Sequence, residues 1–144
     1  MKELSLNILD IAMNSVKAKA KNILIKLIET DETLTLTIQD NGCGMSEETV
    51  QNVMNPFYTT RTTRSVGLGV PLLKLAAEQT GGGIEIQSVS ENDNPVSHGT
   101  TVTAEFFKNH LDFTPLGDVI STVTTLIQGN PEIEWRFVHE INGQ

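Results

Sequence analysis

The sequence predicts an α/β fold of the two-layer sandwich type, in which a mixed, mainly antiparallel sheet carries helices on one face. Apolar and polar residues alternate over Leu34–Gln39, which is typical of a strand with one buried face. From Leu4 to about Lys19, apolar residues recur at steps of three and four, which is typical of an amphipathic helix. Most of the expected strands are joined by short turns, so hairpins and a single sheet are favoured.

The first half of the chain is expected to supply a hairpin and a short helix. Ile23–Glu29 is rich in β-branched residues and predicts a strand, and Asp31–Glu32 supplies the turn into Leu34–Gln39. Ser46 is suited to cap a helix that has two glutamates in its first turn. This helix is expected to end before Pro56.

The middle of the chain predicts a helix and two more strands. Leu68–Gln79 has helical character, with Pro71 in the first turn, and Gly81–Gly83 ends the helix. Ile84–Ser90 and Thr101–Phe107 are then expected as strands.

The C-terminal part predicts one more helix and one more strand. Thr114–Pro115 is expected to open a helix that Gly129 closes, and apolar residues alternate from Ile133 to Phe137. We expect a single domain over residues 1–144, with 108–144 as a C-terminal extension and Asn130–Ile141 as a place where a partner docks.

Composition narrows the class of protein. The chain has 144 residues, which suits one domain, and its net charge of -8 with ten scattered Lys and Arg argues against non-specific nucleic-acid binding. Cys43 is the one cysteine, so an intrachain disulfide is impossible. Neither a membrane-spanning apolar run nor a signal peptide is evident, so we expect a cytoplasmic location without membrane association. The histidines, His98, His110 and His139, are interpreted as structural or surface residues.

A first group of polar residues lies on the N-terminal helix. Asp10, Asn14 and Lys17 stand at i, i+4 and i+7, so they share one side of the helix. They offer a carboxylate to orient a nucleophile, an amide oxygen for Mg²⁺ and an ammonium for a phosphate. An ordinary solvated helix face remains the alternative.

A second group follows the expected strand Leu34–Gln39. Asp40 lies at the strand end, where its carboxylate is placed to accept a hydrogen bond from an exocyclic amine. Gly42 and Gly44 let the backbone approach a ligand, and Met45 follows them. A simple strand-to-helix turn would use the same residue types.

The third and fourth groups lie farther along the chain. A loop rich in hydroxyls and arginine runs into a Gly-x-Gly helix start, where backbone N–H groups suit phosphate. The residues of interest there are Thr60, Arg61, Arg64, Gly67, Leu68 and Gly69. The loop is not a Walker A sequence. Gly99-Thr100-Thr101 forms a tight entry to the next strand, and on its own it is ordinary turn chemistry.

The order and spacing of these four groups resemble the ATP-binding domain shared by DNA gyrase, the heat-shock chaperone, histidine kinases and the mismatch-repair ATPase (the GHKL superfamily). The resemblance covers roughly 4–107 and implies a Bergerat fold. The Asn14 stretch resembles the N box, Asp40–Gly44 the G1 box, Asn55-Pro56-Phe57 the F box, and Gly67–Gly69 the G2 box.

The resemblance implies a role for each matched residue. Asn14 would coordinate Mg²⁺, and Asp40 would hold the adenine amino group while Gly44 lets the ring lie close. Thr60 to Gly69 would form a lid over ATP, with the N–H groups of Gly67 and Gly69 donating to phosphate, and Thr100 would support the Asp40 end of the pocket. The implied cofactors are ATP and Mg²⁺. The implied nucleotide-binding residues are Asn14, Lys17, Asp40, Gly42, Gly44, Met45, Phe57, Thr60, Arg61, Arg64, Gly67, Leu68, Gly69 and Thr100.

Two departures from the family pattern leave the activity open. Hydrolytic members usually carry Glu where this chain has Asp10, the expected catalytic residue, and no phosphoacceptor hairpin precedes Leu4. One hypothesis is a kinase that transfers the γ-phosphoryl to a protein partner. The alternative is a nucleotide-switched binding module with little or no hydrolysis.

Overall fold

The computed structural model describes residues 4–53, 69–109 and 117–142. In chain order the elements are α1 (Leu4–Lys17), β1 (Asn22–Glu29), β2 (Thr33–Asp40), α2 (Glu47–Val53), α4 (Gly69–Gln79), β3 (Gly83–Val89), β4 (Gly99–Phe107), α5 (Val119–Gly129) and β5 (Glu134–Ile141).

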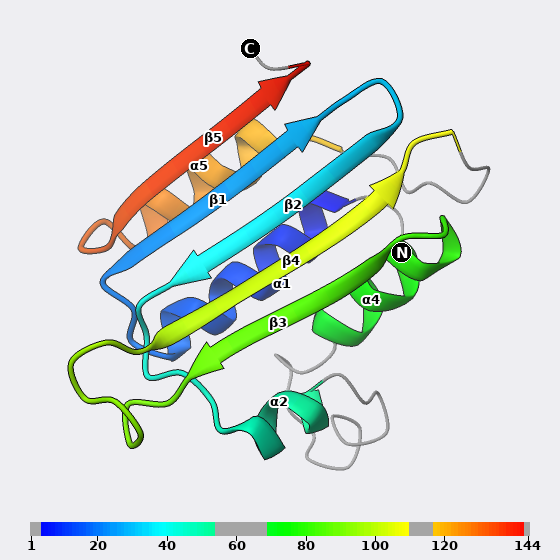
Figure 1. Ribbon diagram of the computed structural model, residues 1–144. Coiled ribbons are helices and arrows are strands. Elements are labelled where there is room, and N and C mark those ends of the chain that lie inside the picture. The colour runs from blue at the N-terminus through cyan, green and yellow to red at the C-terminus, as the bar shows by residue number, and fades with distance from the viewer. Residues whose placement is uncertain (1–3, 54–68, 110–116, 143–144) are drawn as a thin grey trace.

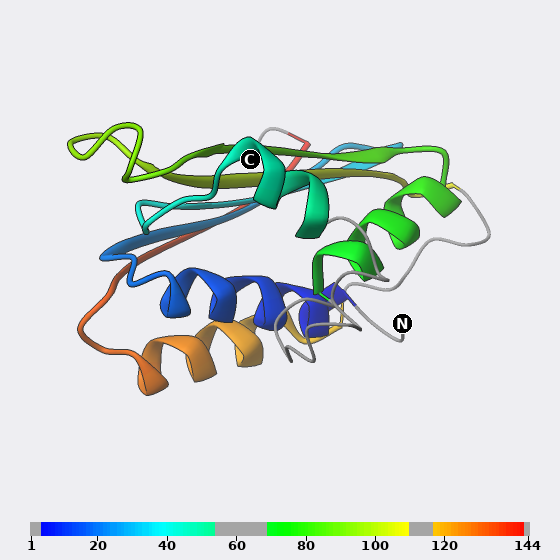
Figure 2. The same ribbon diagram turned by 90° about the horizontal axis from the view of Figure 1, so that it is seen from below.

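The strands form one five-stranded sheet in the order β3-β4-β2-β1-β5. β5 runs parallel to β1, and the other neighbouring pairs are antiparallel. Helices α1, α4 and α5 cover one face of the sheet, and α2 lies near the β3 edge (Figures 1 and 2). The predicted two-layer α/β sandwich with a mixed, mainly antiparallel sheet is confirmed.

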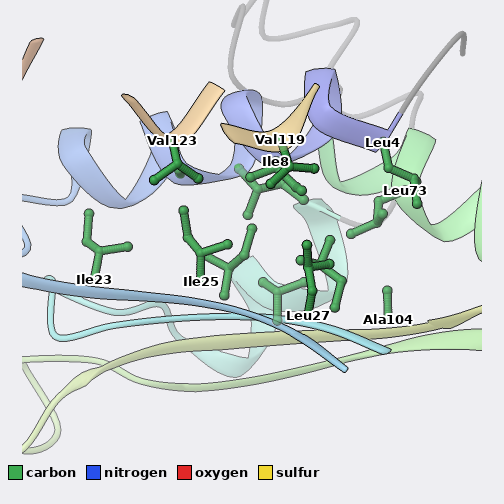
Figure 3. Packing of buried hydrophobic residues seen from close by; sticks show 14 of the residues in the cluster. Leu4, Ile8, Ile23, Ile25, Leu27, Leu73, Ala104, Val119 and Val123 are labelled. Carbon is green, nitrogen blue, oxygen red and sulfur yellow. The ribbon is translucent and has the colours of Figure 1, made fainter. Parts of the chain in front are cut away.

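The hydrophobic core lies between α1, α4, α5 and the inner face of the sheet. Alternation places Ile25, Leu27 and Leu36 on that face, where each is at most 1% exposed. Leu4 and Ile8 of α1 pack above them in Figure 3, with residues of α4 and α5 to either side. This packing fixes α1 over the centre of the sheet.

The strand register brings the expected site residues to one end of the sheet. Asp40 is the last residue of β2 and lies opposite Ile23 of β1 and Thr100 of β4. Below it, α1 ends at Lys17, where the chain turns through Lys19 with φ of 62°. The C-terminal end of α1 therefore lies beside the C-terminal end of β2.

The strand bounds differ from the expected ones by a few residues, and two helices also have ends that differ from those the sequence suggested. α5 begins at Val119, where the Asp118 side chain caps it by accepting a hydrogen bond from Ser121 N at 3.0 Å, while the expected start at Thr114–Pro115 lies outside the described residues. α1 ends two residues early, since the N–H of Ala20 bonds to the carbonyl of Ser15. The Ser46 cap is confirmed: its hydroxyl accepts from Thr49 N at 3.2 Å.

None of the described helices has both the length and the apolar character needed to cross a membrane.

Candidate nucleotide site

A cavity of about 230 Å³ opens between α1 and the inner face of the sheet, at the end where β2 finishes. Its walls are mainly apolar, with a few polar groups that converge on it, which is the usual make-up of a small-molecule site. The lining residues are Ile11, Asn14, Ser15, Lys17, Ala18, Ile38, Asp40, Cys43, Gly44, Met45, Val70, Ile86, Thr100 and Val102.

The carboxylate of Asp40 is held in a fixed orientation. Ser15 donates its hydroxyl to Asp40 Oδ2 at 2.5 Å, and the N–H of Gly42 donates to Asp40 Oδ1 at 2.8 Å. Ser15 is buried on α1, and Gly42 follows β2 in the loop. A carboxylate oxygen has capacity for more than one hydrogen bond, so both oxygens can still accept from a ligand.

The loop after Asp40 is packed too tightly for side chains at its glycines. A Cβ on Gly44, which has φ of 72°, would lie 1.9 Å from the carbonyl oxygen of Val89. At Gly42 a Cβ would meet Ala18 at 2.8 Å. Gly44 lines the cavity. A glycine is required at this position because the backbone of β3 occupies the space that a Cβ would need.

Hydroxyl groups attach this loop to the neighbouring strands. Ser88 of β3 accepts a hydrogen bond from Met45 N at 2.8 Å, and its oxygen lies 2.8 Å from Thr100 Oγ1. Ser88 also donates to the carbonyl of Gly99 at 3.1 Å. His98 Nδ1 contacts the carbonyl of Gly42 from the other side. Thr100 lines the cavity directly opposite Asp40 on the neighbouring strand and is held by its contact with Ser88.

Asn14 supplies an unsatisfied polar atom at the cavity. Its Oδ1 is buried and has no hydrogen-bond partner among the described residues. Such an atom is destabilising unless a ligand, a cation or water satisfies it. Lys17, one turn further along α1, also lines the cavity and is otherwise exposed.

Asp10 lies on the same helix, one turn before Asn14. It is exposed and is not among the residues that line the cavity. Partial burial raises the pKa of its carboxyl, and the charge of Lys17 acts in the opposite direction. The structure therefore places Asp10 on the exposed surface of α1 and outside the lining of the cavity.

Comparison with known proteins agrees with this geometry. Residues 1–115 match the family described as histidine kinase-, DNA gyrase B-, and HSP90-like ATPase. The chain belongs to that family. It is accordingly an ATP-binding domain of the histidine kinase-like ATPase type, as the four sequence groups suggested.

The relatives of this ATPase-family chain include sensor kinases. The sensor histidine kinase YvrG of Bacillus subtilis (strain 168) is 32% identical over 101 residues, which cover 66% of this chain and 16% of that protein. The signal transduction histidine-protein kinase AtoS of Escherichia coli (strain K12) is 29% identical, over 62% of this chain and 14% of that protein. The chain thus spans well under a fifth of the length of these relatives.

A solved structure shows the same fold. The Aquifex aeolicus MutL ATPase domain complexed with ADP matches 99% of this chain and 62% of its own chain, with a TM-score of 0.63. Sequence identity is 15%, so this likeness concerns the fold alone. The Bergerat fold expected for an ATPase of this family is confirmed.

Part of the expected site lies outside the described residues. These positions are Phe57, Thr60, Arg61, Arg64, Gly67 and Leu68. Gly69 is the first residue of α4, and the next residue, Val70, lines the cavity. The start of α4 is therefore at the cavity, as expected for the G2 box of a histidine kinase-like ATPase.

The sequence analysis missed Ser15 and Ser88. Ser15 is buried on the side of α1 that also buries Leu4, Ile8 and Ile11, and Ser88 is half-buried on the same face of β3 as Ile84 and Ile86. A hydroxyl at a buried position needs a polar partner nearby. That requirement was an available signal for Ser15 on the buried side of α1, whereas the role of Ser88 depends on the distant Met45 and shows only in the folded chain.

Proposed function

We propose that this domain binds Mg-ATP in the cavity and transfers the γ-phosphoryl group to a side chain of a protein partner. The observation that carries the nucleotide part is the fixed Asp40 carboxylate in a mainly apolar cavity. A carboxylate that two donors already orient costs little reorganisation when it accepts a third hydrogen bond.

The base selectivity follows from the chemistry of Asp40. The 6-amino group of adenine is a donor, which matches a carboxylate, whereas guanine carries an acceptor oxygen at the same position. Ile38, Ile86 and Val102 supply apolar surface around a flat ring. Adenine nucleotides are therefore favoured over guanine nucleotides.

The phosphate end of the site follows from α1. The buried, unsatisfied Oδ1 of Asn14 is the type of hard oxygen ligand that Mg²⁺ takes alongside phosphate oxygens. Lys17 is close enough along the helix to place its charge near the phosphates. These residues fit a Mg²⁺ ion bound mainly through the nucleotide, which neutralises phosphate charge.

The transfer step is assigned to positioning by Asp10. Phosphoryl transfer depends mostly on orientation and charge stabilisation and demands little from a base. Asp10 stands one turn before Asn14 and is exposed, so a hydroxyl or imidazole on a docked protein has access to it. The relatives named above are kinases, which supports transfer to a protein.

The position of Asp10 also supports a second candidate function. Asp10 is absent from the cavity lining, so a small water molecule bound at the phosphates would be far from its short side chain. A domain with that arrangement binds nucleotide and hydrolyses it slowly, which suits a nucleotide-switched protein-binding module.

Transfer to protein distinguishes the two candidates. The purified chain is incubated with ATP that carries ¹⁸O in its γ-phosphate and with an extract of its own cells, and labelled phosphopeptides are identified by mass spectrometry. The kinase proposal predicts labelled protein that disappears with Asp40→Asn. Unlabelled protein, at a nucleotide concentration that saturates the site, would contradict transfer and leave the switch.

A further inference from the structure

The outer edge of β5 is an unpaired strand edge. β5 lies at the end of the sheet beside β1, and no described residue pairs with its other side. The strand is eight residues long and contains no proline or lysine, which are common protections of such an edge. An edge of this kind is a template for one more strand.

The hydrogen bonds to β1 show which groups of β5 face outward. The N–H groups of Glu134 and Asn142 bond to the carbonyls of Lys21 and Glu29 on the β1 side. Because N–H and C=O groups alternate in direction along a strand, the even-numbered residues face β1. The outward groups belong to Trp135, Phe137, His139 and Ile141.

The two faces of β5 are chemically distinct. Trp135 and Phe137 lie opposite Ile23 and Ile25 and pack against the core. Arg136, Val138 and Glu140 therefore point to the opposite, helix-free face. Glu134 at the start of the strand shares that face, so its charges from Glu134 to Glu140 run anion, cation, neutral, anion.

We propose that this edge binds a second copy of the chain, with β5 pairing antiparallel to β5 about a two-fold axis through Val138. In this register Arg136 of each copy lies opposite Glu140 of the other, which gives two ion pairs on the open face. On the helix face, Trp135 of one copy lies opposite Ile141 of the other. Ile141 is 52% exposed in the single chain, so this pairing would cover an exposed apolar residue.

The neighbouring registers are disfavoured by charge and by hydrogen bonding. Residues whose backbone N–H and C=O groups face outward must lie opposite residues of the same kind in the other copy. The alternative registers therefore place the two-fold axis at the next residue on either side of Val138. With the axis at Phe137, Glu134 lies opposite Glu140 twice. With the axis at His139, two histidines face each other and Arg136 loses its acidic partner. Like charges directly opposite are destabilising.

Helix α5 supplies a second surface at the same edge. It lies behind β5 and β1 in Figure 1, and none of its eleven residues is charged. Ile120 and Ile127, seven residues apart and on one side of the helix, are 65% and 42% exposed. A two-fold axis normal to the sheet keeps the α5 helices of both copies on the same face of the joined sheet.

A disulfide across the axis tests this register. Val138 and its copy form a non-hydrogen-bonded pair, whose Cα atoms lie about 4.5 Å apart, within the range for a disulfide. Val138→Cys should give a disulfide-linked dimer under mild oxidation. Arg136→Cys is the matched control, because the two copies of residue 136 lie about 13 Å apart. Equal cross-linking of both variants, or of neither, would overturn the proposal.

Charge reversal tests the same interface without cross-linking. Sedimentation equilibrium should show the wild-type chain approaching twice 15.8 kDa at high micromolar concentration. Glu140→Arg should weaken self-association about tenfold, since two attractive pairs become repulsive, and the double variant R136E/E140R should restore it. A wild type that stays monomeric, as it would if the edge binds a different protein, overturns the proposal, and so does a double variant without recovery.

Discussion

Ser15 donates its hydroxyl to Asp40 Oδ2 at 2.5 Å, and this hydrogen bond joins helix α1 to the end of β2. It links the helix that carries Asn14 to the strand that carries the proposed adenine acceptor. The two ends of the proposed nucleotide site are therefore fixed relative to each other through one side-chain contact.

Ser15→Ala should weaken nucleotide binding. Hydrogen bonds to charged groups contribute about 1.5–3 kcal/mol, so loss of this one should lower ADP affinity by about tenfold or more. Isothermal titration calorimetry measures the change. Ser121→Ala, which removes an exposed hydroxyl on α5, is the control and should bind as wild type. Unchanged ADP affinity in Ser15→Ala would show that Asp40 needs no support from α1.

Asn14→Ala should weaken nucleotide binding more in the presence of Mg²⁺ than in a chelator. The substitution removes the buried Oδ1 but leaves the Asp40 carboxylate in place. Titrations of ADP with Mg²⁺ and with a chelator give the two affinities. Exposed Asn92 provides the matched control, Asn92→Ala. An equal loss in both conditions would mean that Asn14 has only a structural role.

Asp10→Ala should separate chemistry from binding. Loss of one group that orients the nucleophile typically lowers a rate by about 10²- to 10³-fold. ATP affinity should change little, because Asp10 does not line the cavity. Single-turnover phosphoryl transfer, or residual hydrolysis, is compared with titration calorimetry on the same variant. Full activity in Asp10→Ala would assign the nucleophile-orienting role to another residue.

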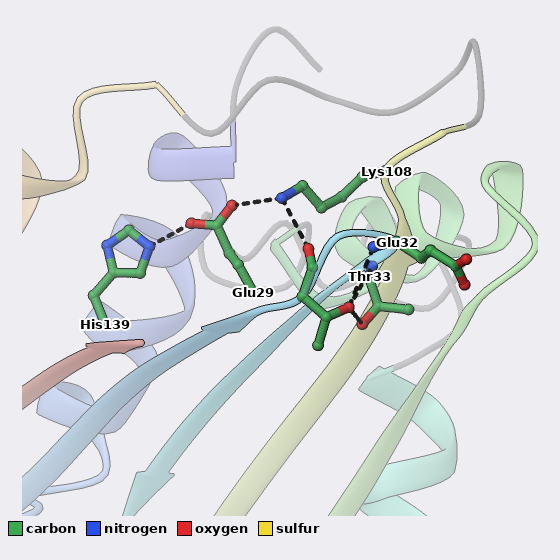
Figure 4. A network of polar contacts seen from close by, with 6 residues as sticks. Glu29, Glu32, Thr33, Lys108 and His139 are labelled. Carbon is green, nitrogen blue, oxygen red and sulfur yellow. Dashed lines mark hydrogen bonds and ion pairs between the residues drawn. The ribbon is translucent and has the colours of Figure 1, made fainter. Parts of the chain in front are cut away.

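Glu29 ties the C-terminal strand to the rest of the sheet in a pH-dependent way. It accepts from His139 Nε2 at 2.5 Å and from Lys108 Nζ at 3.1 Å (Figure 4). Partial burial raises the pKa of Glu29, but the hydrogen bonds and charges of His139 and Lys108 outweigh it, so the net pKa is lowered from 4.5. A carboxyl group whose pKa is lowered in the folded state stabilises the fold at pH values above its ordinary pKa. This contribution is lost as the pH falls through the lowered pKa.

Glu29→Gln should therefore lower the free energy of unfolding by about 1 kcal/mol at pH 7. The difference from wild type should shrink once the pH falls well below 4.5. Urea denaturation at several pH values measures it, and Glu132→Gln, on an exposed turn, is the control. A difference that stays constant with pH would indicate a packing effect and not a charge effect.

Local patterns in the sequence were enough to predict most of the fold. The alternation of Leu34, Leu36 and Ile38 follows from a sheet with one buried face, and that face is covered by α1 as expected. Pairing between distant segments is a different matter. The parallel alignment of β5 with β1 depends on how α5 packs against α1, and nothing local to Glu134–Ile141 specifies it.

The site was predictable where backbone chemistry is local and was missed where it depends on neighbours. Asp40 and Gly44 stand out because a turn after a strand needs such residues. Gly44 has the positive φ expected of it, and the structure adds a second reason for glycine, since Val89 of a distant strand leaves no room for a Cβ. Ser88 acts on Met45 across 43 residues of sequence, so only the folded chain shows it.

The most direct test of the central claim is calorimetric titration of the wild-type chain with Mg-ADP and with Mg-GDP, alongside Asp40→Asn. The wild-type chain should bind ADP well and GDP at least about tenfold more weakly, because Asp40 accepts a hydrogen bond at this position and only adenine donates at its 6-position. Asp40→Asn should lose most of the ADP affinity. Equal affinity for the two nucleotides, or ADP binding that survives Asp40→Asn unchanged, would contradict an adenine site at Asp40.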